Sequence, residues 1–206
     1  MQPEPADLAD LANRFVEVRG LTEAIAEPLS AEDQTAQSMP DVSPTKWHRA
    51  HTTWFFEEFV VGPHLPGYAP CHPAYRYLFN SYYDAVGARH PRAERGVITR
   101  PGIEEVGAYR RHVDRAVLDL LAGLAALHAR GVAHRDISPN NGMIEVQDGT
   151  ERGRLLDLGY ARMIEEDKGL VLTPPDTSTG MMIWGSEGYV APERFRGRPG
   201  DYRADI

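Results

Sequence analysis

The sequence is poor in cysteine, in basic charge and in long apolar runs. Cys71 is its single cysteine, which excludes an internal disulfide and fits a reducing compartment. A net charge of −8 gives no support to binding of nucleic acid or of an anionic membrane. No apolar run approaches the ~20 residues of a membrane span, and residues 1–11 lack the basic start of a signal peptide. These absences predict a cytoplasmic protein.

What is present is typical of a globular protein, with 42% hydrophobic and 25% charged residues in a chain of 206. This length is sufficient for one large domain or two small ones, each with a core of its own. No internal repeat or low-complexity tract divides the chain. The composition leaves the oligomeric state open.

Apolar residues at three- and four-residue steps predict two helices in the first third of the chain. The first runs from Leu8 to Ile25. The second covers Thr45–Val61, with Ser43 as its N-cap and Pro44 at its first position. A polar connection is expected between them. The tyrosine-rich segment 70–87 is expected to be helical over its second half.

A longer helix is predicted within residues 100–134. Pro101 suits its first turn, and Gly131 ends the pattern. Its apolar stripe consists of Ile103, Val106, Tyr109, Val113, Val117, Leu120, Leu124 and Leu127. Beyond it, segments 142–147 and 154–157 flank the turn Asp148–Gly149 and predict a β-hairpin. The tail from residue 165 is rich in proline and glycine, so it is expected to be dominated by loops.

Histidines on the second helix are the first candidate site. His51 shares one helical face with Trp47, Trp54 and Glu58. A histidine that points from a helix into an aromatic-lined bundle is a common metal ligand, because neighbouring helices supply the other ligands. The alternative is that His51 and the nearby His48 are ordinary amphipathic residues with a hydrogen bond each.

Several segments resemble the N-terminal DinB-like domain of the iron-dependent sulfoxide synthases of ergothioneine biosynthesis. The resemblance covers about residues 10–120, and its motifs lie at residues 32–35, 37–48, 51–57, 78–83 and 87–92. It implies Fe(II) held by three histidines, and the partners would be a small thiol and a trimethylated histidine. By position, His51 resembles the first iron ligand of the family. His48 is a weaker candidate for an iron ligand. Arg89 and Arg92 resemble the arginines that hold the thiol's carboxylates.

The remaining iron ligands of that family come from a His-Glu-x-x-His motif, which this chain lacks. His128 and His134 cannot replace it on one helical face, because they are six residues apart with Gly131 between them. His112 has no second histidine at helical spacing. A complete three-histidine iron site is therefore not expected.

The second candidate site is the run from His134 to Asn141, which has the spacing of a protein-kinase catalytic loop. In this interpretation Asp136 is the base, and Asn141 is a ligand of Mg²⁺ on the phosphates of ATP. Asp157 opens an Asp-Leu-Gly triplet that resembles the metal-binding Asp-Phe-Gly. Ser138 occupies the usual position of a lysine, which leaves the phosphoacceptor open.

Residues from about 121 to 206 therefore resemble part of a protein-kinase large lobe, which implies ATP and Mg²⁺ as cofactors. Gly185–Glu193 resembles the end of an activation segment, and Asp205 resembles the aspartate that opens the central helix of that lobe. The chain contains neither a Gly-x-Gly-x-x-Gly loop nor a Val-Ala-x-Lys strand before residue 120. Positioning of ATP, on which phosphoryl transfer depends, is expected to suffer.

The prediction is a mainly α chain in two parts. Residues 1–120 form an incomplete DinB-like helical bundle, and residues 121–206 form a partial α/β kinase large lobe with a short β-hairpin. The seam is expected between Val117 and Leu124, where the apolar stripe is unbroken. Three functions stay open: iron-dependent sulfoxide synthesis, kinase-like phosphoryl transfer and non-catalytic interaction. The two enzyme sites are both expected to be incomplete. The fusion could be natural, a gene-model error or artificial.

Overall fold

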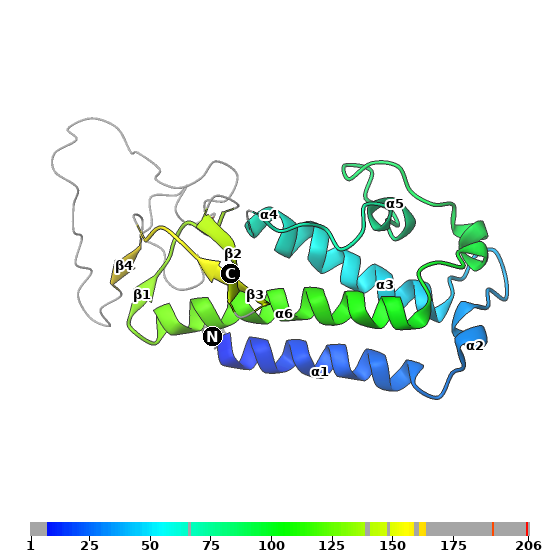
Figure 1. The fold of residues 1–206 in the computed structure, drawn as a ribbon, viewed down its shortest axis with the longest axis horizontal. Coiled ribbons are helices and arrows are strands. Elements are labelled where there is room, and N and C mark those ends of the chain that lie inside the picture. Colours follow the sequence, from blue (N-terminus) through cyan, green and yellow to red (C-terminus); the bar gives the residue numbers. More distant parts are fainter. Residues whose placement is uncertain are drawn as a thin grey trace, which may run out of the picture. The chain divides into compact units, whose positions relative to one another are not determined.

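A computed structural model describes the chain over residues 8–65, 67–138, 141–147, 149–158, 161–163, 191 and 205. The prediction of a mainly α-helical chain is confirmed, and two small antiparallel sheets complete the fold (Figure 1). Two compact units are present, one of Ala12–Pro63 and Gly67–Leu118, and one of Met1–Leu11, His64–Pro66 and Asp119–Ile206. Within the described ranges, no helix has the length and apolarity needed to cross a membrane.

The helical elements follow one another up to residue 128. They are α1 (Leu8–Ala26), α2 (Ala31–Thr35), α3 (Thr45–Phe56), the π-helical turn η1 (Glu57–Val61), α4 (Gly62–His64), α5 (Tyr75–Leu78), the 3₁₀ helix η2 (Arg92–Val97) and α6 (Ile103–His128). The predicted first helix and the long helix are both confirmed. Members of the predicted stripe on α6 are buried, namely Val106, Tyr109, Val113, Val117, Leu120 and Leu124.

Several predicted helix boundaries are wrong. Pro44 is the N-cap of α3, and the hydroxyl of Ser43 instead accepts a hydrogen bond from Arg95 Nη1 at 2.8 Å. Helix α6 begins two residues after Pro101, at Ile103. The polar connection contains the short helix α2, which Ser30 caps. In the tyrosine-rich segment the only helix within the described residues is α5, which covers Tyr75–Leu78 in the first half, so the prediction of a helical second half is wrong.

The second predicted helix changes its hydrogen-bond pattern at Glu57. The N–H of Gly62 donates to the carbonyl of Glu57, a five-residue step that defines the π-helical turn. A Cβ at Gly62 would lie 2.9 Å from that carbonyl oxygen, so the turn depends on glycine at this position. The chain then continues into α4, so the helical stretch extends three residues beyond the predicted Val61 and ends at His64.

In the first unit, α1, α3 and the first part of α6 lie side by side (Figure 1). The rings of Phe15 and Phe56 are 5.0 Å apart and join α1 to α3. Arg19 Nη2 lies 2.8 Å from Thr53 Oγ1 and 2.7 Å from Asp114 Oδ1, so one α1 side chain bonds to both neighbouring helices. Burial of charged Arg19 requires such partners, and they fix the alignment of the three helices.

The second unit contains the strands β1 (Val132–Ala133), β2 (Gly142–Gln147), β3 (Thr150–Leu155) and β4 (Arg162–Met163). β2 pairs with β3 across a turn in which Gly149 has φ of 73°, which confirms the predicted hairpin. Its second strand begins at Thr150, earlier than predicted. β1 pairs with β4, a contact that the sequence did not reveal. Gly142 is required because a Cβ there would collide with the carbonyl oxygen of His64.

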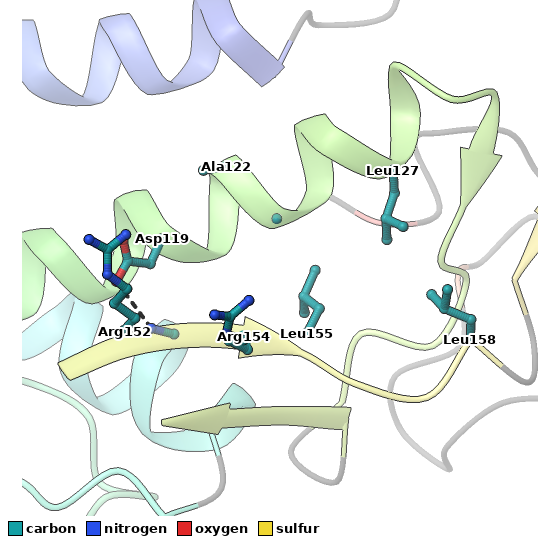
Figure 2. Close-up of a pocket in the computed structure, with 9 residues that line it drawn as sticks. Asp119, Ala122, Leu127, Arg152, Arg154, Leu155 and Leu158 are labelled. Carbon is teal, nitrogen blue, oxygen red and sulfur yellow. Dashed lines mark hydrogen bonds between the residues drawn. The ribbon is translucent and has the colours of Figure 1, made fainter. Parts of the chain in front are cut away.

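Helix α6 also lies along the hairpin in this unit (Figure 2). Asp119 Oδ2 accepts a hydrogen bond from the N–H of Gly153 on β3 at 3.1 Å. Leu127 and Leu155 face a cavity of about 340 Å³ between α6 and β3. Of the predicted loop-dominated tail, only Ala191 and Asp205 lie within the described residues beyond residue 163.

Candidate functional site

The predicted catalytic loop joins β1 to β2, and the structure brings two of its predicted site residues together. Asn141 Nδ2 donates to Asp136 Oδ2 at 2.6 Å and to the backbone oxygen of Asp136 at 2.9 Å. Both side chains belong to buried residues. Because the amide nitrogen of Asn141 faces Asp136, its oxygen is turned to the other side, where an oxygen-seeking cation such as Mg²⁺ could use it.

Asp205 holds the backbone of this loop from 71 residues away in sequence. Its Oδ2 accepts the N–H of His134 at 2.7 Å, and its Oδ1 accepts the N–H of Arg135. Arg135 has φ of 67°, a left-handed conformation that is unfavourable for a residue with a side chain. The two hydrogen bonds stabilise this conformation immediately before Asp136.

A second set of contacts ties the loop to the segment that precedes Asp157. His134 Nε2 lies 3.0 Å from the carbonyl oxygen of Leu156, so that nitrogen carries the proton of the hydrogen bond. The N–H of Leu156 donates to the carbonyl of Asn141 at 2.6 Å. Asp157 follows directly, exposed and with φ of 58°. Two residues with side chains are therefore left-handed here: Arg135, next to the predicted base, and Asp157, a predicted Mg²⁺ ligand. Such strain clusters at functional sites.

The cavity between α6 and β3 is separate from this loop. Its lining residues include Asp119, Arg152 and Leu158, but none of Asp136, Asn141 and Asp157 (Figure 2). Two predicted motifs lie outside the described residues, namely Gly159 of the Asp-Leu-Gly triplet and Gly185–Glu193 apart from Ala191.

The histidine of the first candidate site is held in one orientation. The ring of His51 stacks between Trp47 and Trp54, at centroid distances of 4.7 and 5.5 Å. Its Nδ1 lies 2.7 Å from the carbonyl oxygen of Phe79 and must donate, since a carbonyl only accepts. Burial lowers the pKa of His51, which favours the neutral ring. Nε2 then carries the lone pair, as in metal-binding histidines.

His48 differs from His51 in its contacts. Its ring meets Trp47 edge to face, with centroids 5.5 Å apart. Burial lowers the pKa of His48, and the neighbouring positive charges of Arg95 and Arg92 lower it further. His48 is thus also held neutral, in a positively charged environment that disfavours a cation beside it.

The predicted substrate arginines lie near a third arginine that sequence reasoning did not single out. Arg89 Nη1 pairs with Asp84 Oδ1 at 2.9 Å, and the guanidinium of Arg92 lies 4.9 Å from the ring centroid of Tyr82. Arg95 is only 3% exposed, and its guanidinium is 3.5 Å from a ring centroid of Trp47. Burial and the charges of Arg92 and Arg89 lower the pKa of Arg95 to about 10.

The spacing of these arginines in the sequence could have indicated that Arg95 belongs with Arg89 and Arg92. They recur every three residues in the sequence, and residues 92–97 form the 3₁₀ helix η2. Side chains three residues apart eclipse one another in a 3₁₀ helix, so Arg92 and Arg95 extend from the same side. A helical turn in this loop was not predicted, and the significance of the spacing was therefore missed.

The predicted iron residues do not form a complete site within the described ranges, where no group of three or more His, Cys, Asp or Glu side chains could hold a metal ion. The ring of His112 lies 5.4 Å from that of Tyr68. His128 Nε2 lies 2.8 Å from Asp205 Oδ2. His51 is the one predicted iron ligand whose orientation suits metal binding.

Comparison with known proteins adds a family match. The model of the protein kinase domain matches residues 93–206. Serine/threonine-protein kinase PknL of Mycobacterium tuberculosis is 32% identical over 155 residues, 73% of this chain and 36% of the relative. PknD of the same organism is 42% identical over 90 residues, 44% of this chain and 12% of the relative. Serine/threonine-protein kinase pkn2 of Myxococcus xanthus is 37% identical over 87 residues, which are 42% of this chain and 10% of the relative.

The family match begins at residue 93, so it includes the whole of α6, and the expected seam between Val117 and Leu124 stays a prediction. The comparisons support the kinase resemblance, and they give no support to a sulfoxide-synthase domain, to Fe(II), or to thiol and trimethylated-histidine partners. The chain spans at most 36% of the length of the three relatives named above.

Proposed function

Because the chain belongs to the protein kinase family, we propose that its second unit carries the catalytic loop of a phosphotransferase that uses ATP and Mg²⁺. The observation that carries this proposal is the 2.6 Å contact between Asn141 Nδ2 and Asp136 Oδ2 on a loop whose backbone Asp205 holds. The contact joins a potential base to a potential metal ligand. Positioning of this kind supplies most of phosphoryl-transfer catalysis.

Each residue has a role in the proposal. Asp136 accepts the proton of the attacking hydroxyl, and the amide oxygen of Asn141 and the carboxylate of Asp157 would hold Mg²⁺. When bound, Mg²⁺ neutralises charge on the phosphates. The sequence lacks the glycine-rich loop and the lysine that position ATP in this family, so this chain by itself should bind nucleotide weakly and transfer phosphate slowly.

For the phosphoacceptor we propose a serine or threonine hydroxyl of a protein. The similarity to PknL and PknD, both named as serine/threonine-protein kinases, supports this assignment. Ser138 departs from the usual lysine of such loops, and it is buried at 1% exposure. A buried serine cannot supply the missing positive charge, which is a further reason to expect slow transfer.

Mg²⁺ and ATP together should raise the melting temperature of the protein, because a ligand that binds only the folded state stabilises it. Asp157→Asn should remove most of this shift, since it removes a negative ligand of Mg²⁺. Asp119→Asn is the matched control, because Asp119 is a carboxylate of the same unit outside the catalytic loop. Thermal unfolding with ATP at millimolar concentration, with and without Mg²⁺, measures the effect.

Two results would contradict the phosphotransferase proposal. One is an unchanged melting temperature at every concentration of ATP with Mg²⁺. The other is an equal shift in the Asp157→Asn protein, which would place the nucleotide elsewhere. If the nucleotide does not change the melting temperature at all, the result would favour the alternative that the chain is a non-catalytic interaction protein.

The orientation of His51 favours a second candidate function, and we propose that residues 10–120 derive from a DinB-like domain of the sulfoxide-synthase type. The hydrogen bond from His51 Nδ1 to the carbonyl of Phe79 supports it, since metal-binding histidines are commonly oriented in this way. Arg89 and Arg92 would then bind the carboxylates of a small thiol, and the second substrate would be a trimethylated histidine. The described residues do not fit a complete Fe(II) site, so no reaction step is assigned to this unit.

Anaerobic titration with Fe(II) tests this second candidate. A single imidazole should bind Fe(II) weakly, and His51→Ala should abolish that binding. His64→Ala is the control, because His64 is another histidine whose pKa is lowered by burial, and it is assigned no metal. Equal Fe(II) binding by the original protein and the His51→Ala protein would show that His51 is not a ligand.

A further inference from the structure

Arg95 carries a positive charge that is buried in the first unit and that no carboxylate of the described residues neutralises. Its Nη1 donates to Ser43 Oγ at 2.8 Å, and its guanidinium lies 3.5 Å from a ring centroid of Trp47. Its Nε is buried and has no hydrogen-bond partner among the described residues. A hydroxyl and an aromatic ring stabilise a cation but carry no opposite charge. Because a buried charge without a counterion is costly, an anion bound nearby would be stabilised.

The charges around Arg95 are positive as well. Burial lowers the pKa of Arg95, and the charges of Arg92 and Arg89 lower it further, while burial, Arg95 and Arg92 lower the pKa of His48. Arg89 pairs with Asp84 at 2.9 Å, which offsets its charge. Arg92 and Arg95 pair with no carboxylate in the part of the chain that the structure describes, so two positive charges remain. The site therefore matches an anion with two negative charges.

The segment that carries these arginines is fixed in place by Gln37. Its Nε2 donates to the carbonyl of Arg92 at 2.8 Å, and its Oε1 accepts the N–H of Gly96 at 2.6 Å, so one side chain spans the 3₁₀ helix η2. The guanidinium of Arg92 lies 4.9 Å from the ring centroid of Tyr82, a contact that restricts its orientation. Groups held in this way lose little conformational entropy when a ligand binds.

We propose that Arg92, Arg95 and His48 form a binding site for a phosphate monoester, and that the ligand is a phosphoserine or phosphothreonine side chain of a protein. A phosphate monoester has a charge of about −1.5 to −2 at neutral pH and three acceptor oxygens, which suits guanidinium groups. Arg92 is half-buried and His48 is exposed, so both can contact its oxygens, and the buried charge of Arg95 adds attraction. A carboxylate has a single charge and would neutralise only half of the positive charge.

This inference rests on the function proposed above, because transfer of phosphate to a serine or threonine by the second unit would produce the ligand. One chain would then both form and bind the same modification. Tyr82, which holds Arg92, is 65% exposed. Its ring offers apolar surface beside the phosphate for the peptide around the modified residue, which free phosphate could not use.

Isothermal titration calorimetry of the full chain without Mg²⁺ tests the site with a synthetic phosphoserine peptide, its unphosphorylated form, inorganic phosphate and malonate, all at one ionic strength. The phosphopeptide should bind, and the unphosphorylated peptide should not. Arg92→Gln should raise the dissociation constant of the phosphopeptide about tenfold or more, as expected for loss of a charge-assisted hydrogen bond. Arg76→Gln is the control, because Arg76 is another arginine of this unit, 61% exposed and paired with Glu58.

Two substitutions of Arg95 test the buried charge. Arg95→Lys keeps the charge and should retain binding, whereas Arg95→Gln removes it and should weaken binding about tenfold. Circular dichroism shows whether each variant is folded. If Arg95→Gln does not fold, Arg92→Gln still decides the proposal, because Arg92 is only half-buried.

The synthetic phosphopeptide separates failure of this inference from failure of the proposed function. Binding that Arg92→Gln weakens supports the site even if the second unit transfers no phosphate. Equal affinity for the two peptides overturns the inference, and so does equal affinity of the original and Arg92→Gln proteins. Equal affinity for malonate and phosphate would also overturn it and assign the arginines to carboxylates. Binding of inorganic phosphate without binding of the phosphopeptide would overturn the protein ligand.

Discussion

Replacement of Glu57 with alanine is expected to lower the free energy of unfolding of the first unit by about 3–5 kcal/mol. The residue is 3% exposed. Its Oε1 accepts hydrogen bonds from the hydroxyl of Tyr68 at 2.6 Å and the N–H of Cys71 at 3.0 Å, and its Oε2 accepts one from the hydroxyl of Tyr109. Alanine would leave these three donors without their acceptor, and one of them, the hydroxyl of Tyr109, is fully buried. Urea unfolding followed by fluorescence of the buried Trp47 and Trp54 measures the loss.

The neighbouring Glu58 provides the control for Glu57. Burial raises the pKa of Glu58, so its charged form is disfavoured in the folded protein. It pairs with Arg76, whose Nη1 lies 3.6 Å from Glu58 Oε2 and whose side chain is 61% exposed. Glu58→Gln should therefore change stability by less than about 1 kcal/mol. Similar effects of the two substitutions would show that the hydrogen bonds to Glu57 are not what stabilises the unit.

Asp205→Ala should have a comparable effect on the second unit, with a loss of about 3–5 kcal/mol. The substitution removes the acceptor of the N–H groups of His134 and Arg135 and of the ring of His128. It also removes the compensation for the left-handed backbone at Arg135. Hydrogen exchange of amides in the catalytic loop and in β1 should become much faster, and the amides of α1 serve as an internal reference.

The conservative variant Asp205→Asn makes this prediction more specific. Asparagine keeps one acceptor oxygen but replaces the other with a donor, which would oppose one of the N–H groups now bound. Its effect should fall between that of Asp205→Ala and the original protein. A catalytic loop whose exchange is unchanged in Asp205→Ala would refute the claim that Asp205 holds it.

Features set by neighbouring residues could be predicted from the sequence. The apolar periodicity specified α1 and α6, because a helix buries one stripe of its surface whatever its partner is. The turn Asp148–Gly149 specified the hairpin, because residues that tolerate left-handed φ favour tight turns. Asp136 and Asn141 are only five positions apart on one loop, so their proximity is also a local feature.

Some local features were nevertheless missed. The capped helix α2 and the 3₁₀ helix η2 occupy segments that were predicted as polar connections. Both helices are short, and an apolar stripe cannot be recognised over five or six residues. The capping pair Ser30 and Asp33 was the available signal for α2, and the three-residue spacing of the arginines was the signal for η2.

The contacts that give the candidate sites their chemistry depend on tertiary structure. Asp205 meets His134 across 71 residues, and His51 meets the carbonyl of Phe79 across 28. No local pattern encodes such pairs, because each depends on where two separate elements are brought by packing. Composition and motifs therefore determined which chemical groups the chain contains, its helical class and its family resemblance. Folding determined which lone pair of His51 is presented, that Arg95 stacks on Trp47, and that Asp205 holds the catalytic loop.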